Sequence, residues 1–238
     1  MIPLLFRREL LSLFCSPIAW VVLVVFSIGT SVWFVKGFHA GEEATLRPTL
    51  EFAALWILPF LAPAISMRML SEEFRTGTFE KLMTSPLTDT QVVLGKWLGG
   101  MGFWAVLLVP LLAQLIALEC VGNPDYGPAA TGILGLGLVG GLYMAVGLFA
   151  SSFTQNQVVA FLVTVFILSI PGVGLSFIKD SPFLAAKWQM AAAYVSVEMQ
   201  YRDFAKGVVD VRNFIYFLSG IALFLFLAVK SLESRRWR

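Results

Sequence analysis

Residues 67–95 read MRMLSEEFRTGTFEKLMTSPLTDTQVVLG and lie between two apolar stretches, each long enough to cross a bilayer. A protein that crosses the membrane several times usually joins its spans by short polar turns. This segment is far longer than such a turn, and it carries helix-start signals, a central glycine and a proline. We therefore predict that residues 67–92 form a cytoplasmic loop that docks onto a soluble partner.

The chain as a whole has the composition of a membrane protein. Of its 238 residues, 58% are hydrophobic and 13% are charged, and its mean hydropathy is +0.81. Soluble domains contain about 25% charged residues, and a core of this length cannot bury so much apolar surface. The net charge of +2, without a run of basic residues, argues against nucleic acid as a partner. One membrane domain, residues 1–238, is expected.

Six apolar segments are long enough to cross about 30 Å of hydrocarbon as helices. They are residues 17–36, 50–70, 92–118, 130–152, 157–178 and 212–231. An all-α integral membrane protein with six transmembrane helices is therefore predicted, and an even number of spans places both termini on one side. Ten of the 17 Lys and Arg residues fall at the termini and in the 67–96 loop, which predicts that these parts are cytoplasmic.

Two segments outside the spans have the pattern of surface helices. In residues 1–16, four apolar residues recur at helical spacing, and Arg7 and Arg8 occupy the other side; the apolar ones are Phe6, Leu10, Leu13 and Phe14. This pattern predicts an interfacial helix, or else a plain extension of the first span. Residues 179–211 interleave aromatic and charged side chains, which predicts short helices at the extracytoplasmic interface. They either shape a substrate gate or seal the bundle.

Glycine pairs at GxxxG spacing indicate close helix packing. Gly95 and Gly99 form one pair at the start of the third span, and Gly137 and Gly141 form another in the fourth. Small residues let helix backbones approach closely in lipid. Packing within the chain is favoured over a dimer seam.

The 67–92 loop contains signals for two helix starts besides its central break. Ser71 is expected to cap a short helix, with Glu72 and Glu73 near its positive end. Gly77 ends that helix. Thr88-x-x-Gln91 has the spacing of a capping box and starts the third span.

A second short helix is expected between these signals. Thr78 starts it and Pro86 stops it, because the residue before proline is driven out of the helical region. Phe79, Leu82 and Met83 lie on one side at helical spacing. Charged residues surround them: Arg75, Glu80 and Lys81. An apolar plug with a charged rim is typical of a protein contact, although the helix could instead pack on its own bundle.

The sequence offers little for catalysis or metal binding. Cys15 and Cys120 are far apart, and His39 is the only histidine, so neither a zinc site nor a Cys/His nucleophile is expected. Gly95-Lys96 is followed by Trp97 and lacks the first glycine of a phosphate-binding loop. No catalytic residue, cofactor or metal is therefore assigned to this chain.

The loop also resembles the first cytoplasmic loop of a known transporter family. The shared residues are Met67-Arg68, Glu72-Glu73, Arg75, Gly77-Thr78, Glu80, Leu82, Pro86 and Gly95-Lys96. Further segments that fit are Asn123–Pro128, Ser151–Gln157 and Phe204-x-x-Gly207-Val208-x-Asp210. Over nearly its whole length the chain is similar to ABC-2 type permeases (type V exporters), and most closely to the gliding-motility-associated (GldF-type) permeases.

The resemblance implies a six-span permease that docks two copies of a separate ABC ATPase, which binds ATP and Mg²⁺, through a coupling helix. It also implies a second permease copy or a paralogue in a dimer, a bacterial cytoplasmic (inner) membrane, and a possible companion membrane subunit with a large extracytoplasmic domain. The complex would export a substrate or transmit force. The residues assigned to ATPase coupling are Glu72, Glu73, Phe74, Arg75, Gly77, Thr78, Phe79, Glu80, Leu82 and Met83; Phe79 is added on physical grounds.

Two other functional classes fit less well. A secondary transporter or channel usually places ionisable residues inside its bundle, whereas Glu51 and Glu119 lie near the predicted ends of spans. An intramembrane enzyme would need a nucleophile and a base, or metal ligands, at membrane depth. The substrate does not follow from the sequence.

Overall fold

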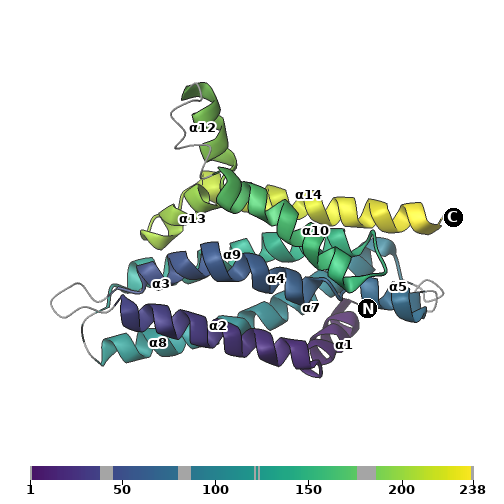
Figure 1. The fold of residues 1–238 in the computed structure, drawn as a ribbon, viewed down its shortest axis with the longest axis horizontal. Helices are drawn as coiled ribbons and strands as arrows, with labels where there is room; N and C mark the ends of the chain where they lie inside the picture. The colour runs from purple at the N-terminus through teal and green to yellow at the C-terminus, as the bar shows by residue number, and fades with distance from the viewer. Residues whose placement is uncertain are drawn as a thin grey trace.

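The computed structural model describes residues 2–37, 45–79, 87–120, 122, 124–175 and 186–236, and every regular element in them is helical. The first half contains α1 (Ile2–Phe14), α2 (Pro17–Lys36), α3 (Arg47–Phe52), the π-helical turn η1 (Ala53–Ile57), α4 (Leu58–Ser66) and α5 (Ser71–Thr76). The second half contains α7 (Asp89–Leu107), α8 (Val109–Glu119), α9 (Tyr126–Ser151), α10 (Gln157–Ser169), η2 (Ile170–Gly174), α12 (Ala186–Val195), α13 (Val197–Ala205) and α14 (Val211–Arg236). Most of these helices run side by side along the long axis of the molecule (Figure 1).

Five described helical segments are long and apolar enough to cross a membrane. They are Pro17–Lys36, Arg47–Thr76, Asp89–Glu119, Tyr126–Ser151 and Val211–Arg235. The apolar helix α10 is shorter, with 13 residues, and it continues into η2. The predicted span 157–178 ends in residues outside the described part of the chain, so a sixth crossing stays a prediction.

Helix α9 forms the centre of the bundle, because its glycines let large side chains approach its backbone. In its most apolar window 72% of the residues are buried, compared with 22% in α2. Trp104 of α7 lies against Gly140, and its indole N–H donates to the carbonyl of Leu136 at 3.1 Å. Of the predicted pair on this helix, Gly141 packs closely within the chain, against Ile221, whereas Gly137 has nothing within 4 Å of an added Cβ.

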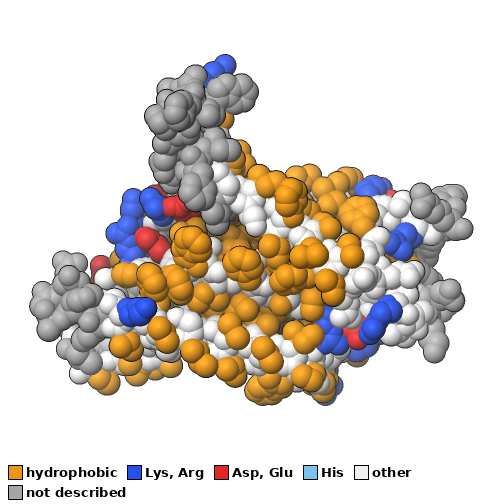
Figure 2. Space-filling view, in the orientation of Figure 1, with side chains coloured by type: hydrophobic (Ala, Val, Ile, Leu, Met, Phe, Trp, Pro, Cys, Tyr) orange, Lys and Arg blue, Asp and Glu red, His pale blue; other side chains and the backbone are white. Residues whose placement is uncertain are grey.

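The two ends of the bundle differ in what they carry. Both termini and α5 lie at one end, which we call the terminal end, and α13 lies toward the other, the opposite end (Figure 1). Apolar side chains cover the middle of the visible face, while Lys, Arg, Asp and Glu gather toward both ends (Figure 2). This distribution fits a molecule whose middle is surrounded by hydrocarbon and whose ends reach water.

At the opposite end, α13 closes the bundle over the start of α9. Tyr201 is buried and its hydroxyl donates to the carbonyl of Gly132 at 3.3 Å, while Thr131 donates to the carbonyl of Phe204 at 2.7 Å. Burial, and secondarily the charge of Glu51, raises the pKa of Tyr201 well above its usual value, so this phenol stays neutral. Helices α12 (Ala186–Val195) and α13 (Val197–Ala205) lie within residues 179–211, where short helices are expected, and α13 packs on α9.

Candidate functional site

The predicted coupling loop begins as a direct continuation of a membrane helix. The helical path from Arg47 to Thr76 is unbroken except for the turn at 67–70. Ser71 is therefore not the residue that caps α5, as the sequence pattern predicted: the cap position is Leu70, and the Ser71 hydroxyl donates back to the carbonyl of Met67. Because the backbone at Ser71 is already helical, its side chain bonds backward instead of capping the next turn.

The end of α5 and the start of α7 follow the sequence signals. Gly77 adopts a left-handed conformation with φ of 68°, which glycine accepts without steric cost. At the start of α7, the Thr88 hydroxyl accepts from the Gln91 amide, and the Gln91 side chain accepts from the Thr88 amide, so the predicted capping box is confirmed.

The apolar plug is packed more closely on its own chain than the pattern suggested. The rings of Phe74 and Phe79 meet edge to face with centroids 4.7 Å apart, and Phe79 is only partly exposed. The guanidinium of Arg235, at the end of α14, lies 4.3 Å from the centroid of Phe74. Glu80, Leu82 and Met83 lie outside the described residues, so the predicted second helix and its apolar face stay predictions. The contact of Arg235 with Phe74 brings the end of α14 against the predicted coupling loop.

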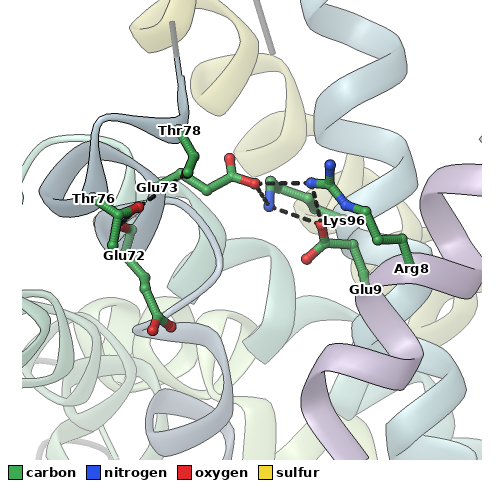
Figure 3. A network of polar contacts seen from close by, with 7 residues as sticks. All are labelled: Arg8, Glu9, Glu72, Glu73, Thr76, Thr78 and Lys96. Atoms are coloured by element: carbon green, nitrogen blue, oxygen red, sulfur yellow. Dashed lines mark hydrogen bonds and ion pairs between the residues drawn. The ribbon is translucent and has the colours of Figure 1, made fainter. Parts of the chain in front are cut away.

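Four charged side chains from three helices form a cluster where α1, α5 and α7 meet (Figure 3). This four-charge cluster contains Arg8 and Glu9 of α1, Glu73 of α5 and Lys96 of α7. Lys96 Nζ lies 2.8 Å from Glu73 Oε1 and 3.2 Å from Glu9 Oε1, and Arg8 Nη2 lies 3.0 Å from each of the same two oxygens. Only 1% of the Lys96 side chain is exposed. A buried ammonium is tolerated only when it is paired, and here two carboxylates share that task.

Helix α1 reaches this cluster because α7 presents a row of glycines to it. A Cβ at Gly95 would lie 2.8 Å from Leu5, and one at Gly99 would lie 2.6 Å from Glu9. The predicted apolar side of residues 1–16 packs on α7, with Phe14 against Phe103 at 5.3 Å between ring centroids. The first GxxxG pair therefore serves packing within the chain, as predicted, and it brings the carboxylate of Glu9 to Lys96.

Arg68, in the turn before α5, links Glu72 of α5 to Ser16 at the corner between α1 and α2. Arg68 contacts both carboxylate oxygens of Glu72, at 2.8 and 3.1 Å, and also contacts the hydroxyl of Ser16. A cavity of about 660 Å³ lies among these groups and the four-charge cluster. Glu72 and Glu73, adjacent in sequence, thus tie α5 to two different places on the bundle.

The outermost part of the segment is left accessible. Arg75, Thr76, Gly77 and Thr78 are exposed, and the hydroxyls of Thr76 and Thr78 lie 3.0 Å apart. Arg75 also lines a hollow with residues 155–158, at the turn between α9 and α10. The assigned residues that the structure describes therefore fall into two groups. Glu72, Glu73, Phe74 and Phe79 contact other residues of the chain, and Arg75, Gly77 and Thr78 are exposed.

Sequence reasoning missed three members of the four-charge cluster: Arg8, Glu9 and Lys96. A signal for Lys96 was present, because it stands within the apolar run VVLGKWLGG and a lysine there requires an acidic partner. Nothing in the pattern identified Glu9 and Glu73 as those partners, since they come from distant parts of the chain.

A protein-family model described as ABC-2 family transporter protein matches residues 5–235. The chain belongs to the ABC-2 transporter family. A search of curated proteins gave no significant match. The match spans every described helix but the outermost residues of α1 and α14, so it covers the four-charge cluster and α5 together.

Membership of the ABC-2 transporter family gives the general class of this protein. It is a multi-pass membrane protein and a membrane component of an ABC transporter. The family implies an ABC ATPase as partner and membrane lipid as surroundings.

Proposed function

We propose that this ABC-2 protein is the permease subunit of an ATP-driven export or force-transmitting complex. Two copies of a separate ATPase subunit, which binds ATP and Mg²⁺, dock at the terminal end, on α5 and the turn at Gly77. The terminal end is cytoplasmic, as the distribution of Lys and Arg favours. A second permease copy or a paralogue completes the transmembrane unit.

The observation that carries this proposal is the link from Glu73 to Lys96. Glu73 sits on the short helix α5, whose far side is exposed, and it contacts a buried lysine on the membrane helix α7. Removing one partner of a buried ion pair costs about 3–5 kcal/mol, because the other charge is left buried and unpaired. The contact therefore favours movement of α5 and α7 together. A push on the exposed side of α5 is thereby passed to the membrane helix.

The same cluster extends the movement to a third helix. Glu9 and Arg8 attach α1 to the same carboxylate and ammonium, and α1 lies along α7. Closure of an ATPase pair against α5 would displace α1, α5 and α7 as one unit. This is the arrangement expected of a mechanical input at the membrane surface.

Finer features of the complex remain expectations from the resemblance stated above. These are the relation to gliding-motility-associated permeases, the bacterial inner membrane and the companion subunit with a large extracytoplasmic domain. Both substrate export and force transmission are likewise expectations from the resemblance.

Copurification of the tagged chain from its native membranes tests ATPase docking. Arg75→Glu reverses an exposed charge beside the Gly77 turn, and Phe79→Asp removes the apolar plug; both should reduce the recovered Walker-motif ATPase by about tenfold or more. Arg75→Glu is the cleaner variant, because Phe79 also packs on Phe74. Lys36→Glu is the matched control, since Lys36 is exposed at the far end of α2.

The control should retain the ATPase at the level of the unaltered chain. If both Arg75→Glu and Phe79→Asp recover a full complement of ATPase, the docking assignment is wrong.

A further inference from the structure

A cavity of about 640 Å³ lies at the opposite end of the bundle, between α12, α13 and the start of α14. Two hydrogen bonds hold α12 in place as its wall. The Tyr216 hydroxyl donates to the carbonyl of Val195 at 2.7 Å, and the Gln200 amide donates to the carbonyl of Tyr194 at 2.8 Å. Figure 1 shows α12 projecting from the bundle beside α13. Both hydrogen bonds attach the C-terminal end of α12, beside the cavity, to α13 and α14.

Two cations in this cavity form no ion pair with a described residue. Lys206 and Arg212 are exposed, and their side chains form no ion pair with any residue that the structure describes. The third cation, Arg202, is paired with Glu198 at 2.6 Å. Two free basic side chains in one hollow are suited to a phosphate group, which accepts charge-assisted hydrogen bonds.

Acidic groups line the same cavity and restrict what can occupy it. Asp203 accepts from the Asn213 amide at 2.9 Å, and Asp210 accepts from the backbone N–H of Arg212 at 2.8 Å. Both carboxylates face a space that also holds the free cations. A purely anionic ligand would be repelled by them, whereas a ligand with a phosphate and an ammonium group satisfies both signs. Charged side chains of both signs gather below α12 on the visible surface (Figure 2).

The position of the cavity indicates where such a ligand comes from. Lys206, Asp210 and Arg212 lie just before the apolar run of α14, at the depth where charged and aromatic side chains meet lipid headgroups. Met190, Tyr194 and Met199 add apolar surface to the lining, and all three are exposed. Leu223, on the same side of α14 as Tyr216, is 53% exposed farther along the helix and can contact an acyl chain.

We propose that this cavity binds the headgroup of a zwitterionic phospholipid that carries a primary ammonium group. Lys206 and Arg212 hold the phosphate, Asp203 and Asp210 receive the ammonium, and the acyl chains run down the surface of α14. The proposal depends on the membrane setting of the ABC-2 family and not on ATPase docking, so either can fail without the other.

Titration of the purified full chain with single lipids, read by native mass spectrometry, tests the site. Phosphatidylethanolamine should bind about tenfold more tightly than phosphatidylcholine, whose trimethylated nitrogen has no N–H to donate. It should also exceed phosphatidylglycerol, which has no ammonium group. Soluble glycerophosphoethanolamine, which has the same head without acyl chains, should compete poorly.

A double variant tests the residues. Lys206→Gln with Arg212→Gln should weaken phosphatidylethanolamine binding by about tenfold or more, because both phosphate contacts are lost. Lys36→Gln removes an exposed cation outside the cavity and should leave binding unchanged. Thermal melting of the variants checks folding, and the comparison of lipids on the unaltered chain stands without them.

Three results would overturn the proposal. They are equal affinity for the three lipids, undiminished binding by a folded double variant, and competition by glycerophosphoethanolamine at the same concentration as the lipid. The last result would assign the cavity to a soluble phosphate compound instead of a membrane lipid.

Discussion

At the terminal end a buried lysine is enclosed by two carboxylates, whereas at the opposite end two cations are exposed and form no ion pair with a described residue. Lys96 is enclosed by Glu9 and Glu73, with distances of 3.2 and 2.8 Å. At the opposite end, Lys206 and Arg212 face solvent, although Arg202 is paired with Glu198. Tyr201 and Tyr216 there donate to backbone carbonyls.

This difference indicates that the two ends have different roles. The four-charge cluster holds three helices in one arrangement. Separating them would leave a buried charge without a partner and away from water, which is unfavourable. Exposed cations contribute little to stability and stay free for a ligand. The terminal end is therefore suited to transmitting movement, and the opposite end to binding.

The two proposed roles need the terminal end and the opposite end to lie on different sides of the membrane. In a chain with Cys15 and Cys120 replaced by Ser, Val209→Cys should react completely with a membrane-impermeant maleimide added to intact cells. Thr78→Cys should react only after permeabilisation; both positions are exposed. Fluorescence of the tagged chain on a gel gives the readout. Labelling of Thr78→Cys in intact cells would invert the proposed orientation.

Removing the central cation should be the most damaging of the stability changes. Lys96→Met leaves two carboxylates close together with only Arg8 between them, and should destabilise the fold by about 3 kcal/mol. Lys36→Met, which removes an exposed lysine, should change stability by less than about 0.5 kcal/mol. Denaturant or thermal unfolding in detergent measures both. Equal stability of the two variants would show that the four-charge cluster holds nothing together.

Replacing either of two glycines by alanine should change stability less than Lys96→Met does, and the two changes should differ. Gly99→Ala places a Cβ 2.6 Å from Glu9 Cβ and pushes α1 away, so it should cost about 1–2 kcal/mol. Gly137→Ala meets nothing within 4 Å and should be neutral or stabilising by up to about 1 kcal/mol, because alanine favours helix. The same unfolding assay compares them. A destabilised Gly137→Ala would contradict the packing described for α9.

Much of the fold follows from local pattern. The apolar segments are long enough to span a bilayer, and in five cases the described helices include the predicted core of the span. Gly77 ends α5 and Thr88 caps α7, because these effects depend on the residue itself and its near neighbours. Ser71 was misplaced by one position, because whether it caps depends on the helical turn before it.

The candidate site was only half predictable. The accessible group from Arg75 to Thr78 lies where the loop pattern placed it, but Glu73 turns inward to Lys96 and Phe74 turns toward Arg235. The sequence pattern gives the spacing of these residues along one helix. It carries no information on which distant helix lies opposite.

Sequence by itself determined that this chain is a helical membrane protein with a long charged loop, because hydropathy, glycine and capping residues act over a few neighbouring positions. Tertiary structure alone decided that Lys96 is buried and which carboxylates meet it. It also decided that Lys206 and Arg212 form no ion pair with any residue that the structure describes. These outcomes depend on the packing of α1, α5 and α7 at one end and of α12, α13 and α14 at the other. Electrostatic partners are set by distance in space, which local sequence does not encode.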